Sequence, residues 1–229
     1  MNKSKSCTIV IPIYNDFESL VVLSDWIKES AKFRTEFLIV DNGSTDRRIH
    51  AFLEEQEITY TTSLTNLGFG GAIIFAAERV SSDWIAWMPG NLKVDPRTLV
   101  SFLEEFHFSP NTFVKAKRIN RGRIANVKTY LAGAIQSTIL LRNMLDTGGT
   151  PTLCERSFLL SLKDPPKDIV FESFMLYAAR HRRKNIVRPK FPYGQRVFGQ
   201  SHWQKGFKSE ITLMVKIVNN CLRWRKRTM

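Results

Sequence analysis

The most informative stretch of this 229-residue chain is Trp84-Ile-Ala-Trp-Met-Pro-Gly-Asn-Leu-Lys93. Its apolar first half has the length of a β-strand, and Pro89 with Gly90 makes the backbone turn where that strand ends. Asn91 and Lys93 therefore stand at the carboxyl end of a strand. Open α/β sheets bind their ligands at that edge, so we expect a binding site here.

Similar strand and turn units surround this stretch. Apolar runs at 7–13, 37–40, 58–62 and 113–116 predict strands. Helical spacing of apolar side chains follows the first three runs, and Pro96 begins a helix after the quoted stretch. We expect Ser44 to be the N-cap of the helix that runs to about residue 55. These alternations predict an α/β fold with a mostly parallel sheet flanked by helices.

The second half of the chain gives weaker signals. Residues 130–145 predict a mostly apolar helix that fits either the core or a membrane interface, and 186–188 predict an edge strand. The loop 193–203 concentrates polar and aromatic residues, which favours a functional role. We place one domain at 1–205 and a basic amphipathic helix at 206–229.

The predicted C-terminal helix has an apolar face with cations around it, a pattern typical of a helix that lies on a membrane. Anionic lipid would attract these cations, and Trp224 is expected at the membrane interface. Docking of this helix on the core of the protein, or on a second copy of the chain, is the alternative. The apolar face comprises Ile211, Met214, Val215, Val218, Cys221 and Leu222.

The chain is strongly basic, with 34 Lys and Arg against 21 Asp and Glu and a formal net charge of +13. This charge favours nucleotides, nucleic acid or an acidic membrane as partners, but no nucleic-acid recognition motif accompanies it. Five of the nine residues 115–123 are cationic, and they are either solvated or bind an anion. Cys7, Cys154 and Cys221 have no metal-ligand spacing, which predicts free thiols in a reducing compartment. The N-terminal apolar run is too interrupted for a signal peptide or a membrane span.

Several of these motifs, in this order, resemble the inverting family 2 glycosyltransferases of GT-A fold (the Rossmann-like nucleotide-diphospho-sugar transferase fold), particularly the dolichyl- and polyprenyl-phosphate sugar synthases. The motifs are Ile11-Pro-Ile-Tyr-Asn-Asp16, Val40-Asp-Asn-Gly-Ser-Thr-Asp46, Asn66-Leu-Gly-Phe-Gly70, Pro89-Gly-Asn-Leu-Lys93, and Arg196 with Gly199-Gln-Ser-His202. The resemblance implies transfer of a sugar from a nucleotide-diphosphate donor to a polyprenyl phosphate. It also implies a cytoplasmic protein that associates peripherally with an anionic membrane surface. Homo-oligomerisation is left open.

The resemblance also assigns roles to residues. Asp41 is expected to accept a hydrogen bond from the base of the donor nucleotide, although capping its own turn is the alternative. The other expected donor-binding residues are Pro12, Tyr14, Asp16, Gly43, Pro89 and Gly90. Residues expected at the acceptor phosphate are Arg118, Arg121, Arg123 and Ser201. Catalytic roles are expected for Lys93, Asn91, Arg196 and Asp146.

This chain departs from the family at its metal-binding motif. The family usually has Asp-x-Asp where this chain has Pro89-Gly-Asn91, so Mg²⁺ or Mn²⁺ would be held poorly. We expect the Lys93 ammonium, on the same side as Asn91 if the backbone is extended, to replace the ion's charge. A weakly bound metal held by Asn91, Asp95 or His202 is the alternative.

Two other functions remain open at this point. A transferase that extends a lipid-linked or surface polysaccharide would use a hydroxyl acceptor and need a general base, for which Asp146 and Glu172 are the candidates. A non-catalytic scaffold that binds a nucleotide sugar or a membrane would also fit the altered metal motif. Nucleic-acid binding rests on net charge alone.

Overall fold

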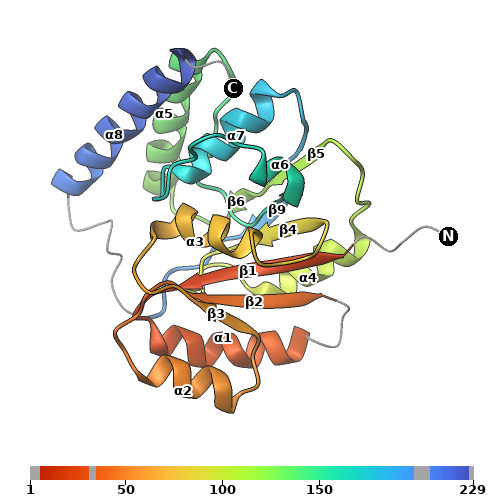
Figure 1. The fold of residues 1–229 in the computed structure, drawn as a ribbon. Helices are drawn as coiled ribbons and strands as arrows, with labels where there is room; N and C mark the ends of the chain where they lie inside the picture. The colour runs from red at the N-terminus through yellow and green to blue at the C-terminus, as the bar shows by residue number, and fades with distance from the viewer. Residues whose placement is uncertain (1–5, 31–34, 199–206, 227–229) are drawn as a thin grey trace.

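The computed structural model describes residues 6–30, 35–198 and 207–226 (Figure 1). The first half consists of β1 (Cys7–Ile13), α1 (Phe17–Ser30), β2 (Glu36–Asp41), α2 (Arg48–Glu55), β3 (Tyr60–Thr62), α3 (Gly68–Ala77), β4 (Trp84–Trp87), α4 (Pro96–Glu105) and β5 (Thr112–Lys115). The second half consists of β6 (Lys117–Ile119), α5 (Arg123–Leu140), β7 (Thr152–Glu155), α6 (Arg156–Leu160), α7 (Phe171–His181), β8 (Asn185–Val187), β9 (Lys190–Pro192) and α8 (Phe207–Lys226).

A seven-stranded sheet with the order β3-β2-β1-β4-β7-β5-β8 forms the centre of the molecule. Its strands are mostly parallel, which confirms the predicted class, and β8 is the edge strand that the sequence indicated. β7 was not predicted, and it runs antiparallel between β4 and β5. A second, two-stranded sheet pairs β6 with β9. These two strands lie beside the edge at which the sequence predicts a binding site.

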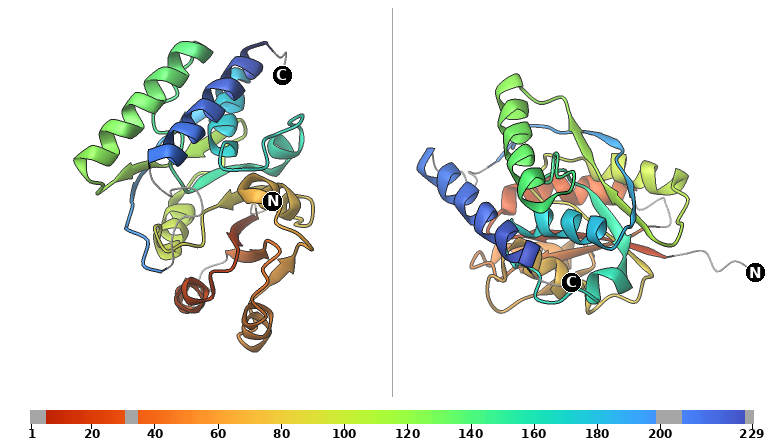
Figure 2. Two further views of the ribbon diagram at one scale, coloured as in Figure 1. Left: turned by 90° about the vertical axis from the view of Figure 1, so that its left-hand side faces the viewer. Right: turned by 90° about the horizontal axis from the view of Figure 1, so that it is seen from above.

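Helices cover both faces of the sheet, as Figure 1 shows. Side chains alternate along β1 because successive residues of a strand point to opposite faces. Ile9 and Ile11 pack into the cluster formed with α1, α2 and α4, whereas Val10 packs into the cluster formed with α3 and α7. Two apolar layers therefore hold the sheet between them. α5 and α8 lie side by side outside α7 (Figure 2).

Several predicted boundaries were wrong. Ser44 is not an N-cap: α2 begins at Arg48, after an Arg47 that makes no capping hydrogen bond, and the Ser44 hydroxyl instead accepts from the Asn15 amide at 3.0 Å. The apolar helix expected at 130–145 is α5, which begins at Arg123 and ends before Leu141, a residue with a left-handed φ of 51°. Arg123, Asn126 and Lys128 interrupt the apolar pattern of its first turns, which concealed its start.

The end of α8 is docked on the protein. Trp224 is only 3% exposed, stacks on Tyr177 with a 16° angle between the rings, and packs edge-on against Phe174. Its carbonyl accepts a hydrogen bond from the Tyr177 hydroxyl at 3.3 Å. The expectation that Trp224 lies at a membrane interface is therefore wrong, and Cys221, fully buried, is also unavailable to a membrane. None of the helices in the described ranges has both the length and the apolar character needed to cross a bilayer.

Candidate functional site

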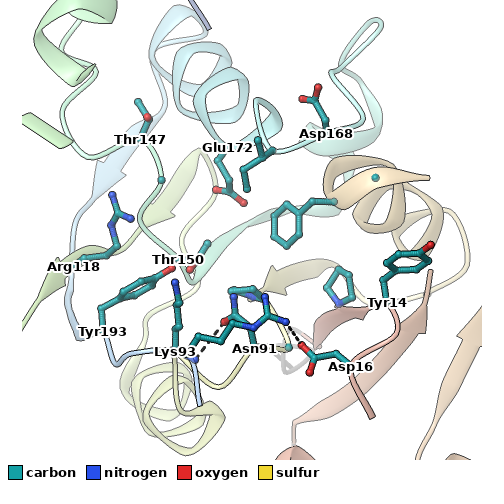
Figure 3. Close-up of a pocket in the computed structure, with 18 of the residues that line it drawn as sticks. Tyr14, Asp16, Asn91, Lys93, Arg118, Thr147, Thr150, Asp168, Glu172 and Tyr193 are labelled. Carbon is teal, nitrogen blue, oxygen red and sulfur yellow. Dashed lines mark hydrogen bonds and ion pairs between the residues drawn. The ribbon is translucent and has the colours of Figure 1, made fainter. Parts of the chain in front are cut away.

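A cavity of about 1200 Å³ opens at the carboxyl ends of β1 and β4, where the sequence predicted a binding site (Figure 3). The residues that line it come from segments far apart in the chain. They include the ends of β1 and β4, the loop before α3, the start of α7 and the segment after β9. Parallel strands bring their carboxyl ends to one edge, which explains why these segments meet.

Most of the expected donor-binding residues line this cavity. Pro12, Tyr14 and Asp16 approach it from β1, and the turn Pro89-Gly-Asn91 approaches it from β4. Gly90 is required in this turn, because a Cβ there would lie 2.8 Å from the Ile13 Cγ2 and 3.2 Å from the Pro12 carbonyl oxygen. The turn can therefore pack directly against the end of β1.

Asp41 and Gly43 are not among the described residues that line the cavity. Asp41 is fully buried and accepts hydrogen bonds from the Ser44 amide at 3.0 Å and from His50 Nε2 at 2.6 Å. Gly43, with φ of +76°, packs against the backbone of Thr65. Asp41 therefore caps its own turn in the structure.

Asn42, which the sequence did not single out, lies in the cavity wall next to Asp41. Its side-chain Nδ2 donates to Asn66 Oδ1 at 3.2 Å, and its Oδ1 accepts from the Leu67 backbone amide at 2.9 Å. These bonds join the loop after β2 to the loop before α3. Its position in a run of turn formers after a strand was the available signal.

Five cations line the cavity: Lys93, Arg118, Arg121, Lys167 and Arg196. We call Lys93, Arg118, Arg121 and Arg196 the cation cluster. Arg196 forms an ion pair with Asp16 at 2.5 Å, and its Nε donates to the Phe198 carbonyl at 2.6 Å. This pair connects residues that are 180 positions apart in the chain. Neither of these two contacts uses Arg196 Nη1.

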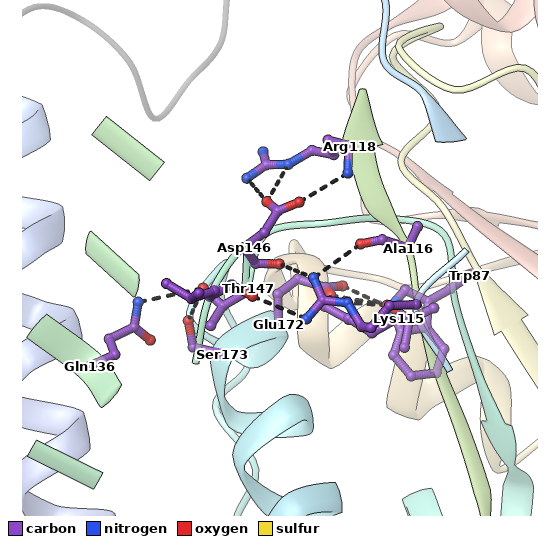
Figure 4. Close-up of polar contacts among 12 residues, drawn as sticks. Trp87, Lys115, Ala116, Arg118, Gln136, Asp146, Thr147, Glu172 and Ser173 are labelled. Atoms are coloured by element: carbon purple, nitrogen blue, oxygen red, sulfur yellow. Dashed lines mark hydrogen bonds and ion pairs between the residues drawn. The ribbon is translucent and has the colours of Figure 1, made fainter. Parts of the chain in front are cut away.

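Asp146 orients Arg118. Arg118 Nε donates to Asp146 Oδ1 at 2.7 Å, its backbone amide donates to Oδ2 at 2.9 Å, and Nη2 makes a further contact (Figure 4). Burial works against ionisation of Asp146, but the charge and hydrogen bonds of Arg118 outweigh it, so the pKa of this carboxyl lies below its ordinary value. Asp146 is not among the described cavity-lining residues, and it acts on the cavity through Arg118.

Lys93 lies half-buried in the cavity wall. Burial lowers the pKa of its ammonium, and the neighbouring Arg196, Arg121 and Arg118 lower it further. The backbone between Asn91 and Lys93 is not extended, because Leu92 has a left-handed φ of 60°. Asn91 and Lys93 nevertheless both line the cavity, so the turn brings these two residues to the same site.

The remaining predicted acceptor residues divide into three groups. Arg121 lines the cavity, and its Nη1 donates to Thr129 Oγ1 at 2.8 Å. Arg123 is exposed at the first turn of α5 and is not among the described lining residues. Ser201 lies outside the described residues, as does His202, which was expected as a metal ligand.

A buried charge pair lies beneath the cavity floor. Lys115 of β5 is fully buried and contacts the carboxylate of Glu172, a cavity-lining residue of α7 (Figure 4). The same carboxylate accepts from Trp87 Nε1 at 2.7 Å and from the Thr152 hydroxyl at 3.2 Å. Solvation was one expectation for the basic segment 115–123, and it is wrong for Lys115. Burial drives the pKa of this ammonium well below its ordinary value.

The described residues do not fit a divalent metal ion at the turn after β4. Pro89 and Gly90 offer no side-chain ligand, and Asn91 offers a neutral amide. Asp16 is paired with Arg196, and Asp95 caps α4 by accepting from the Arg97 amide at 2.8 Å. Within the described ranges, no group of three or more His, Cys, Asp or Glu side chains is placed to hold a metal.

Comparison with known proteins gives a consistent picture. Residues 8–161 match the model of the family described as "Glycosyl transferase family 2". The chain is 34% identical, over 114 residues, to an undecaprenyl-phosphate 4-deoxy-4-formamido-L-arabinose transferase of Yersinia enterocolitica, and 31% identical over 103 residues to the protein of the same name from Yersinia pestis. These matches cover 45% and 42% of this chain but only 35% and 32% of the two transferases.

Solved structures show the same fold. Glucosyl-3-phosphoglycerate synthase from Mycobacterium tuberculosis, in complex with Mn²⁺, UDP and glucosyl-3-phosphoglycerate, superposes with a TM-score of 0.76 at 17% identity. The alignment covers 97% of this chain and 80% of that one. Its complex with Mn²⁺, UDP-glucose and phosphoglyceric acid gives a TM-score of 0.71 at 15% identity over 97% of this chain and 80% of that one.

Proposed function

Because the chain belongs to glycosyl transferase family 2, we propose that it transfers a sugar, with inversion, from a nucleotide diphosphate to a polyprenyl phosphate. The observation that carries this proposal is that one cavity joins most of the expected donor-binding residues to the cation cluster. The diphosphate of the donor and the phosphate of the acceptor are both anions. The names of the two Yersinia relatives support undecaprenyl phosphate as the type of acceptor.

The proposed reaction needs no general base. A phosphate oxygen of the acceptor attacks the anomeric carbon, the bond from that carbon to the diphosphate breaks, and the nucleoside diphosphate leaves. The acceptor oxygen is already ionised at neutral pH, so no proton has to be removed. Asp146 and Glu172, the candidate bases for a hydroxyl acceptor, are held in ion pairs with Arg118 and Lys115. This favours a phosphate acceptor over a hydroxyl acceptor.

Lys93 supplies positive charge for the departing diphosphate in this proposal. Negative charge grows on the leaving group as the glycosidic bond breaks, and cations fixed beside it stabilise the transition state. Lys93 and Arg196 both line the cavity, and Arg196 is paired with Asp16. Since the carboxylates of a divalent metal site are missing there, we expect turnover to survive exhaustive treatment with EDTA.

An apolar surface next to the cavity fits the polyprenyl chain and the membrane that holds it. Leu213 and Ile217 of α8 line the cavity, and Ile211 and Val215 are exposed apolar side chains on another face of the same helix. α5 adds a second stripe of exposed side chains at helical spacing, formed by Ile124, Val127, Leu131 and Ile135. We propose that these two helices rest on an anionic membrane surface at its cytoplasmic face.

Product analysis tests the proposal. Wild-type protein is incubated with undecaprenyl phosphate and, in turn, with UDP, GDP and dTDP sugars, with and without EDTA, and the lipids are identified by mass spectrometry. A lipid-phosphate sugar is expected from at least one donor. If sugar appears only on a hydroxyl acceptor, the polysaccharide-extending alternative is correct. Donor binding without turnover would indicate the non-catalytic scaffold.

Liposome flotation tests the membrane contact separately. The double variant I211S/V215S should float less with phosphatidylglycerol vesicles than wild type, because apolar area is removed from the proposed contact. The control is Leu64→Ser, which alters a fully exposed apolar side chain in the loop before α3. Equal flotation of all three proteins would contradict a membrane role for α8.

A further inference from the structure

One aromatic ring is shared by three members of the cation cluster. The centre of the Tyr193 ring lies 5.3 Å from Arg118 Cζ, 5.8 Å from Arg121 Cζ and 5.8 Å from Lys93 Nζ. Figure 3 shows the ring beside Arg118 and Lys93 at one end of the cavity. All three distances are within the range of a cation–π interaction, in which the negative face of the ring attracts a cation.

The cluster needs such an attraction because its members repel one another. The pKa of Lys93 is lowered by burial and by the three arginines, which is the electrostatic signature of this repulsion. Asp146 and Asp16 neutralise Arg118 and Arg196. Among the described residues, no carboxylate forms an ion pair with Lys93 or Arg121.

The backbone fixes Tyr193 between the elements that carry these cations. It follows β9, which pairs with β6, the strand that contains Arg118. The Tyr193 amide donates to the Ile119 carbonyl at 3.1 Å, and the Gly194 amide donates to the Lys93 carbonyl at 2.8 Å. The ring is thus tied both to the β6 side of the cavity and to the turn after β4.

We propose that Tyr193 is a positioning residue: its π face holds Lys93, Arg118 and Arg121 together as a preformed site for the phosphate groups of the substrates. This inference rests on the proposed function for the identity of the substrates, but it concerns the binding of phosphate groups as such. The ring contributes through its face. Its hydroxyl and its bulk are not the source of the effect.

Two substitutions separate the ring face from the other contributions. Tyr193→Phe removes the hydroxyl and keeps the face, whereas Tyr193→Leu keeps apolar bulk and removes the face. Binding of inorganic pyrophosphate, which carries no base or sugar, is measured by isothermal titration calorimetry. Y193F should bind within twofold of wild type and Y193L about tenfold more weakly. The control, Tyr130→Leu, alters an exposed tyrosine of α5 and should bind as wild type does.

Three outcomes would overturn the inference. Equal loss in Y193F and Y193L would indicate the hydroxyl, and equal retention would indicate packing alone. Wild-type protein that does not bind pyrophosphate would show that the cluster is not a phosphate site. Y193M replaces Y193L if circular dichroism shows that Y193L is unfolded. Pyrophosphate binding that depends on the Tyr193 ring, in a protein that turns over no donor, would refute the proposed function and leave this inference standing.

Discussion

Substituting Lys115 by Met should destabilise the protein strongly, although Lys115 lies in a segment that is basic overall. The side chain is fully buried, and that of its partner Glu172 is 4% exposed. Removing one member of a buried ion pair leaves the other as an uncompensated charge, which typically costs about 3–5 kcal/mol. Glu172 retains the hydrogen bonds from Trp87 and Thr152. We therefore expect K115M to lower the free energy of unfolding by about 3 kcal/mol, the low end of that range.

Urea denaturation followed by circular dichroism measures this loss. For a protein of this size, a destabilisation of 3 kcal/mol corresponds to a decrease in Tm of roughly 6–12 °C. The matched control is Lys128→Met, which breaks the pair of Lys128 with Glu210 on the surface, where the side chains are 59% and 38% exposed. Because exposed pairs contribute about 0–1 kcal/mol, K128M should remain close to wild type.

A double-mutant cycle completes the test. Replacing Glu172 by Met in the K115M background removes the uncompensated carboxylate, so K115M/E172M should be destabilised by less than the sum of the two single variants. A K115M protein within 1 kcal/mol of wild type, or strictly additive single variants, would refute the view that Lys115 and Glu172 stabilise each other as charges.

Three further predictions concern Lys93, Asp146 and Asp41. If Lys93 must be protonated for turnover, kcat/KM should fall as the pH rises through the pKa of Lys93. Burial and three arginines place that pKa below the ordinary lysine value of 10.5. Lys93→Arg should abolish this decrease in kcat/KM. Asp146 has a folded-state pKa below its ordinary value of 3.8. Its pairing with Arg118 therefore stabilises the protein above about pH 4, and this stabilisation is lost as the pH falls through the folded pKa. The difference in unfolding free energy between wild type and Asp146→Asn should shrink between pH 6 and 3 in urea titrations. If Asp41 recognises the nucleotide base, Asp41→Ala should weaken nucleotide binding by about 1–3 kcal/mol in calorimetry, and unchanged affinity in a folded variant would leave Asp41 with its turn-capping role alone.

The sequence by itself determined the first half of the fold and the location of the cavity. Strand-length apolar runs that end in turn formers need no long-range information, because hydrophobic period and turn chemistry are local properties. The turn after Trp87 illustrates this: its Pro, Gly and Asn residues identified the ligand-binding edge, and the cavity lies there.

Only the tertiary structure decided which charged and aromatic side chains are buried and what they touch. β7 is four residues long, and its place between β4 and β5 depends on strands distant in the chain. Lys115 looked like a member of a basic surface segment, Trp224 like a membrane anchor, and Tyr193 like one residue of a polar loop. Their partners, Glu172, Tyr177 and the cation cluster, come from other elements. A side chain's environment is set by such long-range contacts, and the local sequence pattern does not contain them.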